Sequence, residues 1–165
     1  MKILIISLPR TGSSSLSYDL AIKHNLKEVF EPFDKFAKDV YCLDENNIVL
    51  KTLIFHKSNS FYCELVKEFD TVILLSRRDL NAITESWSYL KHNQKENGFM
   101  SLEKYQWEET PNLQKEKENV IKWNNDMNEL SKLLNIDITY YEDIFDENSN
   151  ERYRIKNIKN IKSLL

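Results

Sequence analysis

Short apolar runs alternate with amphipathic segments along most of this 165-residue chain. Apolar residues with β-type patterning occupy five runs, at residues 2–8, 27–30, 48–54, 71–76 and 136–140. Elsewhere apolar residues recur every three or four positions, which predicts helices over residues 14–24, 59–69, 80–94 and 116–134. Strands that alternate with helices are typical of a parallel sheet covered by helices. The pattern therefore predicts an α/β fold, a three-layer sandwich in which a parallel β-sheet is flanked by helices.

The last predicted helix carries an apolar stripe whose members advance by three and four positions: Val120, Trp123, Met127, Leu130 and Leu134. We interpret this stripe as core packing rather than as a cofactor site. Residues 95–119 are polar and irregular, so we expect them to form a mobile cover over a site.

Composition fits one domain over residues 1–165. A hydrophobic content of 41% is enough for a real core, and a net charge of −3 gives no reason to expect a nucleic-acid partner. No apolar run approaches the ~20 residues that a membrane span needs, and the apolar N-terminus is too short for a signal peptide. We therefore expect a cytoplasmic protein without a membrane partner.

The cysteines and histidines show no metal-binding pattern. Cys42 and Cys63 lack C-x-x-C spacing, which favours buried thiols over a redox or zinc pair. The three histidines lack H-E-x-x-H spacing; they are His24, His56 and His92. The sequence therefore predicts no metal site.

The residues that follow the first apolar run predict an anion site. A buried-strand pattern, a turn of small residues and a helix start follow one another at residues 4–16. In such an arrangement, free backbone N–H groups and the positive end of a helix dipole face one point. The turn is not a Walker A loop, which needs a second glycine and a lysine. Its candidate ligands are Arg10, Thr11, Gly12, Ser13, Ser14 and Ser15. The alternative is a serine-rich helix cap beside an incidental arginine.

A second candidate anion site follows the apolar run 71–76. Arg77 and Arg78 come directly after this run, and Asp79 is placed to cap the next helix. An arginine at the carboxyl end of a strand and Ser86, two turns into the helix, are able to meet on one phosphate. The alternative is a solvated Arg-Asp cluster and a helix serine bonded to its own backbone.

Together these segments resemble the sulfotransferases that use 3′-phosphoadenosine 5′-phosphosulfate (PAPS), particularly the bacterial and carbohydrate-type branch. Residues 9–16 are similar to the family's P-R-[ST]-G-[ST]-[ST]-x-L loop for the 5′-phosphosulfate. Residues 75–79, with a later serine, are similar to the L-x-R-R-D segment of its 3′-phosphate site. Residues 29–33 are similar to its F-E-P segment, and residues 141–144 to its Y-E-D-[LI] segment. The resemblance implies a P-loop NTPase-like sulfotransferase fold, with PAPS as co-substrate and no metal.

The resemblance also implies roles. Residues 11–15 would hold the 5′-phosphosulfate, and Arg78 with Ser86 would hold the 3′-phosphate. Arg77 is either a second phosphate ligand or a structural partner of Asp79 or another acidic neighbour. Sulfuryl transfer builds negative charge on the bridging oxygen of the leaving phosphate, and Arg10 is the best candidate to stabilise that charge.

The acceptor hydroxyl must lose a proton, which requires a base within hydrogen-bond reach. Glu31 follows the second apolar run and matches the F-E-P segment, so we expect it to be the base; the alternative is a surface glutamate. His56, after the third run, is the second candidate. Lys51 and Lys57 are possible contacts of donor or acceptor.

One departure from the family concerns the adenosine. Many sulfotransferases close a basic, glycine-containing segment over it near the C-terminus, but this chain has no glycine after Asp143. Adenine would then be held elsewhere, with Tyr153, Arg154 or residues 95–119 as candidates.

Three functions therefore stay open. The first is an O-sulfotransferase acting on a small hydroxylated acceptor such as a sugar. The others are a P-loop-like nucleotide or metabolite kinase and an inactive nucleotide-binding remnant. The lack of a Walker lysine and of an obvious magnesium-binding aspartate argues against the kinase.

Overall fold

The computed structural model of the chain describes residues 1–35, 37, 41, 45–97 and 113–145, without the side chains of residues 92–97. These residues form one five-stranded sheet in the order β2-β3-β1-β4-β5, in which every paired strand is parallel. The strands are β1 (Lys2–Ser7), β2 (Lys27–Phe30), β3 (Ile48–Leu53), β4 (Thr71–Ser76) and β5 (Ile138–Tyr140). The predicted parallel sheet and α/β class are confirmed.

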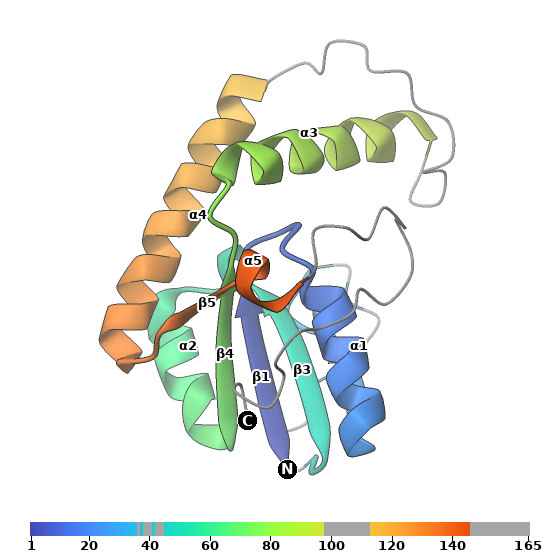
Figure 1. Ribbon diagram of the computed structural model, residues 1–165, viewed down its shortest axis with the longest axis vertical. Coiled ribbons are helices and arrows are strands. Elements are labelled where there is room, and N and C mark those ends of the chain that lie inside the picture. The colour runs from blue at the N-terminus through green and yellow to red at the C-terminus, as the bar shows by residue number, and fades with distance from the viewer. Residues whose placement is uncertain (36, 38–40, 42–44, 98–112, 146–165) are drawn as a thin grey trace.

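Helices cover both faces of the sheet (Figure 1). α1 (Ser13–His24) packs on one face, where the short α5 (Tyr141–Ile144) joins the same core cluster. α2 (Asn59–Leu65) and α4 (Leu113–Leu134) lie on the other face. α3 (Leu80–Asn97) crosses above the carboxyl ends of the strands and packs on α4. The three-layer arrangement is therefore as predicted.

The central strand β1 supplies both layers of the core. Ile3 and Ile5 pack with the α1 side, whereas Leu4 and Ile6 pack with the α2 and α4 side, and all four are fully buried. A strand covered on both faces reads as a continuous apolar run, because every side chain meets a helix. The apolar stripe of α4 also packs on the core, as predicted.

Several predicted boundaries were wrong. The 3-10 helix η1 (Ile54–His56) follows β3, and η2 (Val66–Glu68) ends the segment predicted as one helix over 59–69. α4 begins at Leu113 and α3 continues to Asn97, so both ends of the segment 95–119, predicted to be irregular, are helical. Lys91 of α3 pairs with Glu116 in the first turn of α4, so a tertiary contact supports the polar start of α4. Residues 98–112 lie outside the described residues.

Two further comparisons concern the caps and the cysteines. Asp79 Oδ1 accepts a hydrogen bond from the Ala82 backbone N–H at 3.0 Å, which confirms the predicted cap of α3.

Cys63 is a free, half-buried thiol beside the core, and Cys42 lies outside the described residues. Within the described ranges no helix is long and apolar enough to cross a membrane.

Candidate functional site

The candidate residues gather at one edge of the sheet. Arg10, Glu31, His56 and Arg78 all lie within three residues of the carboxyl end of a strand, and the strands are parallel. From β1 the chain crosses toward β2 at one side of the sheet, whereas from β4 it crosses toward β5 at the other. Ligands of open α/β sheets bind at such a reversal, outside the carboxyl ends of the strands. The edge between β1 and β4 is therefore the expected binding position.

The loop between β1 and α1 presents an uncapped helix N-terminus. Gly12 is the N-cap with φ 73°, no side chain caps the helix, and its first turn holds no acidic residue. The Thr11 hydroxyl is buried and donates to the Leu8 carbonyl at 2.8 Å, so it stabilises the loop. Ser14 is exposed and Ser15 is half-buried, whereas Ser13 is buried. The first-turn amides and the exposed hydroxyl can accept an anion.

Gly12 has a positive φ, and the space around it also excludes a side chain. A Cβ added at this position would lie 2.8 Å from Phe145 Cε2 and 3.2 Å from Tyr141 Cε2. Tyr141 belongs to α5, which is the Y-E-D-I segment at 141–144, and Phe145 is the residue after it. This segment therefore packs directly against the loop.

Arg10 joins the two segments predicted to bind anions. Its Nε donates a hydrogen bond to Ser86 Oγ at 2.7 Å, across 76 residues of sequence. Arg10 is exposed and Ser86 is half-buried on α3. The serine predicted to complete the 3′-phosphate site thus lies beside the loop arginine.

Arg78 has a different partner. Its guanidinium donates to both carboxylate oxygens of Asp143, at 2.8 and 2.7 Å, and lies over the Tyr140 ring. These hydrogen bonds raise the pKa of Arg78 and lower that of the Asp143 carboxyl. Both side chains are about half exposed. Among the described residues, no hydrogen bond joins Arg78 to Ser86.

Glu142 holds the turn after β4. Its carboxylate accepts hydrogen bonds from the backbone N–H of Arg78 at 3.1 Å and of Asp79 at 3.4 Å. Arg77 lies within ion-pair distance of Glu142, with Nε 3.8 Å from Oε1, and over the Tyr141 ring. Glu142 therefore acts as a structural anchor of this turn. We call Arg10, Arg77, Arg78 and Ser86 the arginine side of the edge.

Glu31, at the end of β2, forms an ion pair with Lys51 of β3. The Lys51 ammonium is almost fully buried and lies over the Phe30 ring. Burial lowers the pKa of Lys51, the charge on Arg10 lowers it further, and Glu31 opposes the shift. The buried Lys51 ammonium therefore lies within electrostatic range of both Glu31 and Arg10.

His56 completes this region from η1. Its imidazole is 5% exposed, Nδ1 lies 3.3 Å from Thr52 Oγ1, and Nε2 lies 3.3 Å from Asp34 Oδ2. Burial lowers the pKa of His56, against the opposing influence of Glu31 and Asp34. We call Glu31, Asp34, Lys51 and His56 the glutamate side of the edge.

Backbone strain coincides with the candidate residues. Five described residues other than glycine have positive φ: Arg10, Asn25, Glu31, Asn47 and Asn135. Asparagine tolerates this conformation, but arginine and glutamate do not favour it. The two unfavourable cases, Arg10 at 60° and Glu31 at 46°, are the central residues of the two sides. Such strain concentrates at functional sites.

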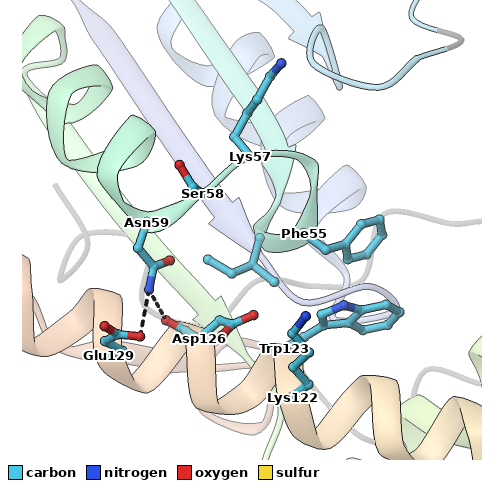
Figure 2. A pocket seen from close by; sticks show the side chains of 9 residues that line it. Phe55, Lys57, Ser58, Asn59, Lys122, Trp123, Asp126 and Glu129 are labelled. Atoms are coloured by element: carbon cyan, nitrogen blue, oxygen red, sulfur yellow. Dashed lines mark hydrogen bonds between the residues drawn. The ribbon is translucent and has the colours of Figure 1, made fainter.

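A pocket of about 390 Å³ opens beside the glutamate side (Figure 2). Phe55 and Trp123 form its aromatic wall, with ring centroids 4.4 Å apart. The Phe55 ring meets the His56 ring edge to face at 5.0 Å. Asn59 donates to the Asp126 carbonyl and to Glu129 at the opposite side. The Phe55 side chain therefore both lines the pocket and contacts His56.

The strand patterns predicted where Arg10, Glu31 and Arg78 lie, but not their partners. Lys51 stands within an apolar run, and Asp34 and Asp143 are common surface residues in sequence. Metal-binding motifs of neighbouring residues could not reveal the surroundings of His56. Glu31 and Asp34 are distant from it in sequence and come close to it only in the folded chain. A lysine inside a buried strand was the one available signal, since an unpaired buried charge is costly.

No protein-family model matches the chain, and a search of curated proteins finds no match.

Proposed function

We propose that the protein is a sulfotransferase that moves a sulfuryl group from PAPS to a hydroxyl of a small acceptor. The observation that carries the proposal is the pairing of an uncapped, arginine-flanked helix N-terminus with a carboxylate on the same sheet edge. The strained backbone of Arg10 and Glu31 supports functional roles for both residues.

On the arginine side, the first-turn amides of α1 would bind the 5′-phosphosulfate. Arg10 would face the bridging oxygen, with its Nε held by Ser86 and its terminal nitrogens toward the donor. The reaction breaks the sulfur–oxygen bond to the phosphate and forms a sulfur–oxygen bond to the acceptor. Negative charge grows on the leaving phosphate, where a fixed guanidinium stabilises it most.

On the glutamate side, Glu31 would take the proton of the acceptor hydroxyl. Its ion pair with the buried Lys51 fixes the direction of the carboxylate. A base that is already oriented avoids reorganisation during the reaction. His56 is the second candidate for this role. The products are the sulfated acceptor and 3′-phosphoadenosine 5′-phosphate.

Arg78 would bind the 3′-phosphate by exchanging Asp143 for the ligand. The Arg78–Asp143 pair is exposed, and an exposed ion pair breaks at little cost. A phosphate offers the same bidentate geometry as the carboxylate that it replaces.

The pocket beside Phe55 supports a small, hydroxylated acceptor such as a sugar. Its size suits a single ring, and the aromatic wall would pack on the apolar face of that ring. Its polar lining, with Asn59 and Lys122 among the residues, would meet the hydroxyls.

The test is product formation from PAPS and a panel of small sugars and alcohols, measured by mass spectrometry. Glu31→Gln keeps an oxygen for Lys51 but removes the base, so turnover should fall about 100- to 10,000-fold with donor affinity little changed. Glu28→Gln is the matched control, because Glu28 lies on β2, just before Glu31, and accepts a hydrogen bond from Ser17 instead of from Lys51. If Glu31→Gln keeps full turnover, Glu31 is not the base. If the wild type sulfates no acceptor and does not cleave the donor, the proposed function is wrong.

A further inference from the structure

Three potential metal ligands meet on the glutamate side. One oxygen each of Glu31 and Asp34 and one ring nitrogen of His56 all lie within 4.8 Å of one another. The shortest separation for which the atoms are identified is 3.3 Å, between His56 Nε2 and Asp34 Oδ2. Two ligands about 2.1 Å from a tetrahedral metal are about 3.4 Å apart. This pair already has the spacing of neighbouring ligands.

A chain of hydroxyl groups leads to Nδ1 of His56. The Tyr62 hydroxyl donates to the Leu53 carbonyl at 2.6 Å and lies 3.4 Å from Thr52 Oγ1. Each hydroxyl has a single proton to donate. With the Tyr62 proton on Leu53, the Thr52 hydroxyl can donate to Tyr62 and accept from His56 Nδ1–H, across a separation of 3.3 Å. That tautomer leaves a lone pair on Nε2, which is the form of the imidazole that binds a metal.

The lone pair on His56 Nε2 faces a carboxylate. Nε2 is buried and has no hydrogen-bond partner within the described part of the chain, although Asp34 Oδ2 is at ion-pair distance. In the Nδ1–H tautomer, two lone pairs face each other at 3.3 Å and repel unless a cation lies between them. Either a proton on Nε2 or a metal ion removes this repulsion. Glu31 adds a third ligand to the same point, which favours the metal.

We propose that Glu31, Asp34 and His56 bind one divalent transition-metal ion, with Zn²⁺ as the best match. One imidazole and two carboxylates suit this ion, and the fourth position stays open. Thr52 on Nδ1 is the outer hydrogen bond that orients a ligating histidine. The carboxylates of Glu31 and Asp34 supply two negative charges at the site, which offset the positive charges of Lys51 and Lys57 beside it.

This metal site does not depend on the proposed sulfuryl transfer. Where that function also holds, the ion occupies the base, so Zn²⁺ inhibits transfer and a chelator restores it. Binding and inhibition are measured separately, so the failure of one is distinguishable from the failure of the other.

The test is calorimetric titration of the full chain with Zn²⁺, supported by the visible absorption of bound Co²⁺. One ion should bind, and His56→Ala and Asp34→Asn should each weaken binding by more than about 10-fold. Thr52→Val keeps all three ligands and should weaken binding about 10- to 100-fold. His24→Ala is the control, because His24 is exposed on α1, and it should leave affinity unchanged. Circular dichroism checks that each variant is folded.

Two results would overturn the metal site. In the first, His56→Ala binds Zn²⁺ as tightly as the wild type. In the second, the wild type binds neither Zn²⁺ nor Co²⁺. Nuclear magnetic resonance of His56 would then show a proton on Nε2, facing Asp34.

Discussion

The arginine side and the glutamate side of the carboxyl edge differ in how deeply their charged side chains are buried. On the arginine side, Arg10 and Arg78 are exposed, and their partners come from distant elements. On the glutamate side, Lys51 is 3% exposed and His56 5% exposed, each beside a carboxylate. Exposed ion pairs break at little cost, whereas a buried charge that loses its partner is strongly destabilising. The arginine side therefore suits a ligand that enters and leaves, and the glutamate side suits groups held in one orientation.

The largest expected effect tests the burial on the glutamate side. Glu31→Ala leaves the Lys51 ammonium buried without its carboxylate and should lower the free energy of unfolding by about 3 kcal/mol. Lys51→Met instead leaves Glu31, which is 21% exposed and can reach water, so the loss should stay within about 1 kcal/mol. Urea unfolding measures both variants. Equal losses of stability in the two variants would show that the deeper burial of Lys51 has no energetic consequence.

The next effect concerns the loop of the arginine side. Gly12→Ala forces a positive φ on alanine and places its Cβ against Phe145, which should lower the free energy of unfolding by about 2 to 4 kcal/mol. Ser14→Ala, at an exposed position of the same helix, should change it by less than about 0.5 kcal/mol. Thermal and urea unfolding provide the comparison. A fully stable Gly12→Ala variant would contradict the close packing of Phe145.

A third prediction tests whether Arg78 binds the 3′-phosphate of the ligand. Arg78→Ala should weaken 3′-phosphoadenosine 5′-phosphate about 10- to 100-fold, the range for hydrogen bonds to a charged group. Adenosine 5′-phosphosulfate, which lacks the 3′-phosphate, should be almost unaffected. Calorimetry on both ligands decides the matter, and equal losses would place Arg78 elsewhere.

Backbone strain gives a smaller effect. Arg10→Gly and Arg10→Ala both remove the hydrogen bond to Ser86, but only glycine relaxes the positive φ. Arg10→Gly should therefore be more stable than Arg10→Ala by about 1 kcal/mol in urea unfolding. Identical stabilities would mean that the loop is not strained at Arg10.

The smallest effect tests whether the Arg78 pair is exchangeable. Asp143→Asn removes the carboxylate that competes with a 3′-phosphate, so 3′-phosphoadenosine 5′-phosphate should bind about two- to five-fold more tightly. Glu142→Gln is an informative companion, because Glu142 holds the backbone of the turn rather than the guanidinium. Weaker binding by Asp143→Asn would indicate that Asp143 positions Arg78 for the ligand.

The sequence predicted the fold because apolar runs report burial directly. The runs at 2–8 and 71–76 became β1 and β4 almost unchanged, and the parallel sheet then placed Arg10 and Arg78 at one edge. Helix ends were predicted less well. α4 begins before its apolar stripe, where Glu116 pairs with Lys91 of α3, and α3 continues beyond its predicted end.

The partners of the site could not be predicted in the same way. The pairing of Arg78 with Asp143 spans 65 residues, and that of His56 with Asp34 depends on how η1 meets the segment after β2. Neither leaves a periodic signal in sequence, because each is decided by the positions of side chains above the sheet. α5 was missed for a similar reason: its four residues are helical only where Tyr141 and Ile144 reach the α1 side of the core.

The most direct test of the proposed donor site is calorimetric binding of 3′-phosphoadenosine 5′-phosphate to the wild type, compared with ATP and Mg²⁺. We predict that the first ligand binds one per chain and more tightly than ATP, and that Arg10→Ala weakens it by more than about 10-fold. Tighter binding of ATP with Mg²⁺, or binding that Arg10→Ala leaves unchanged, would contradict the account.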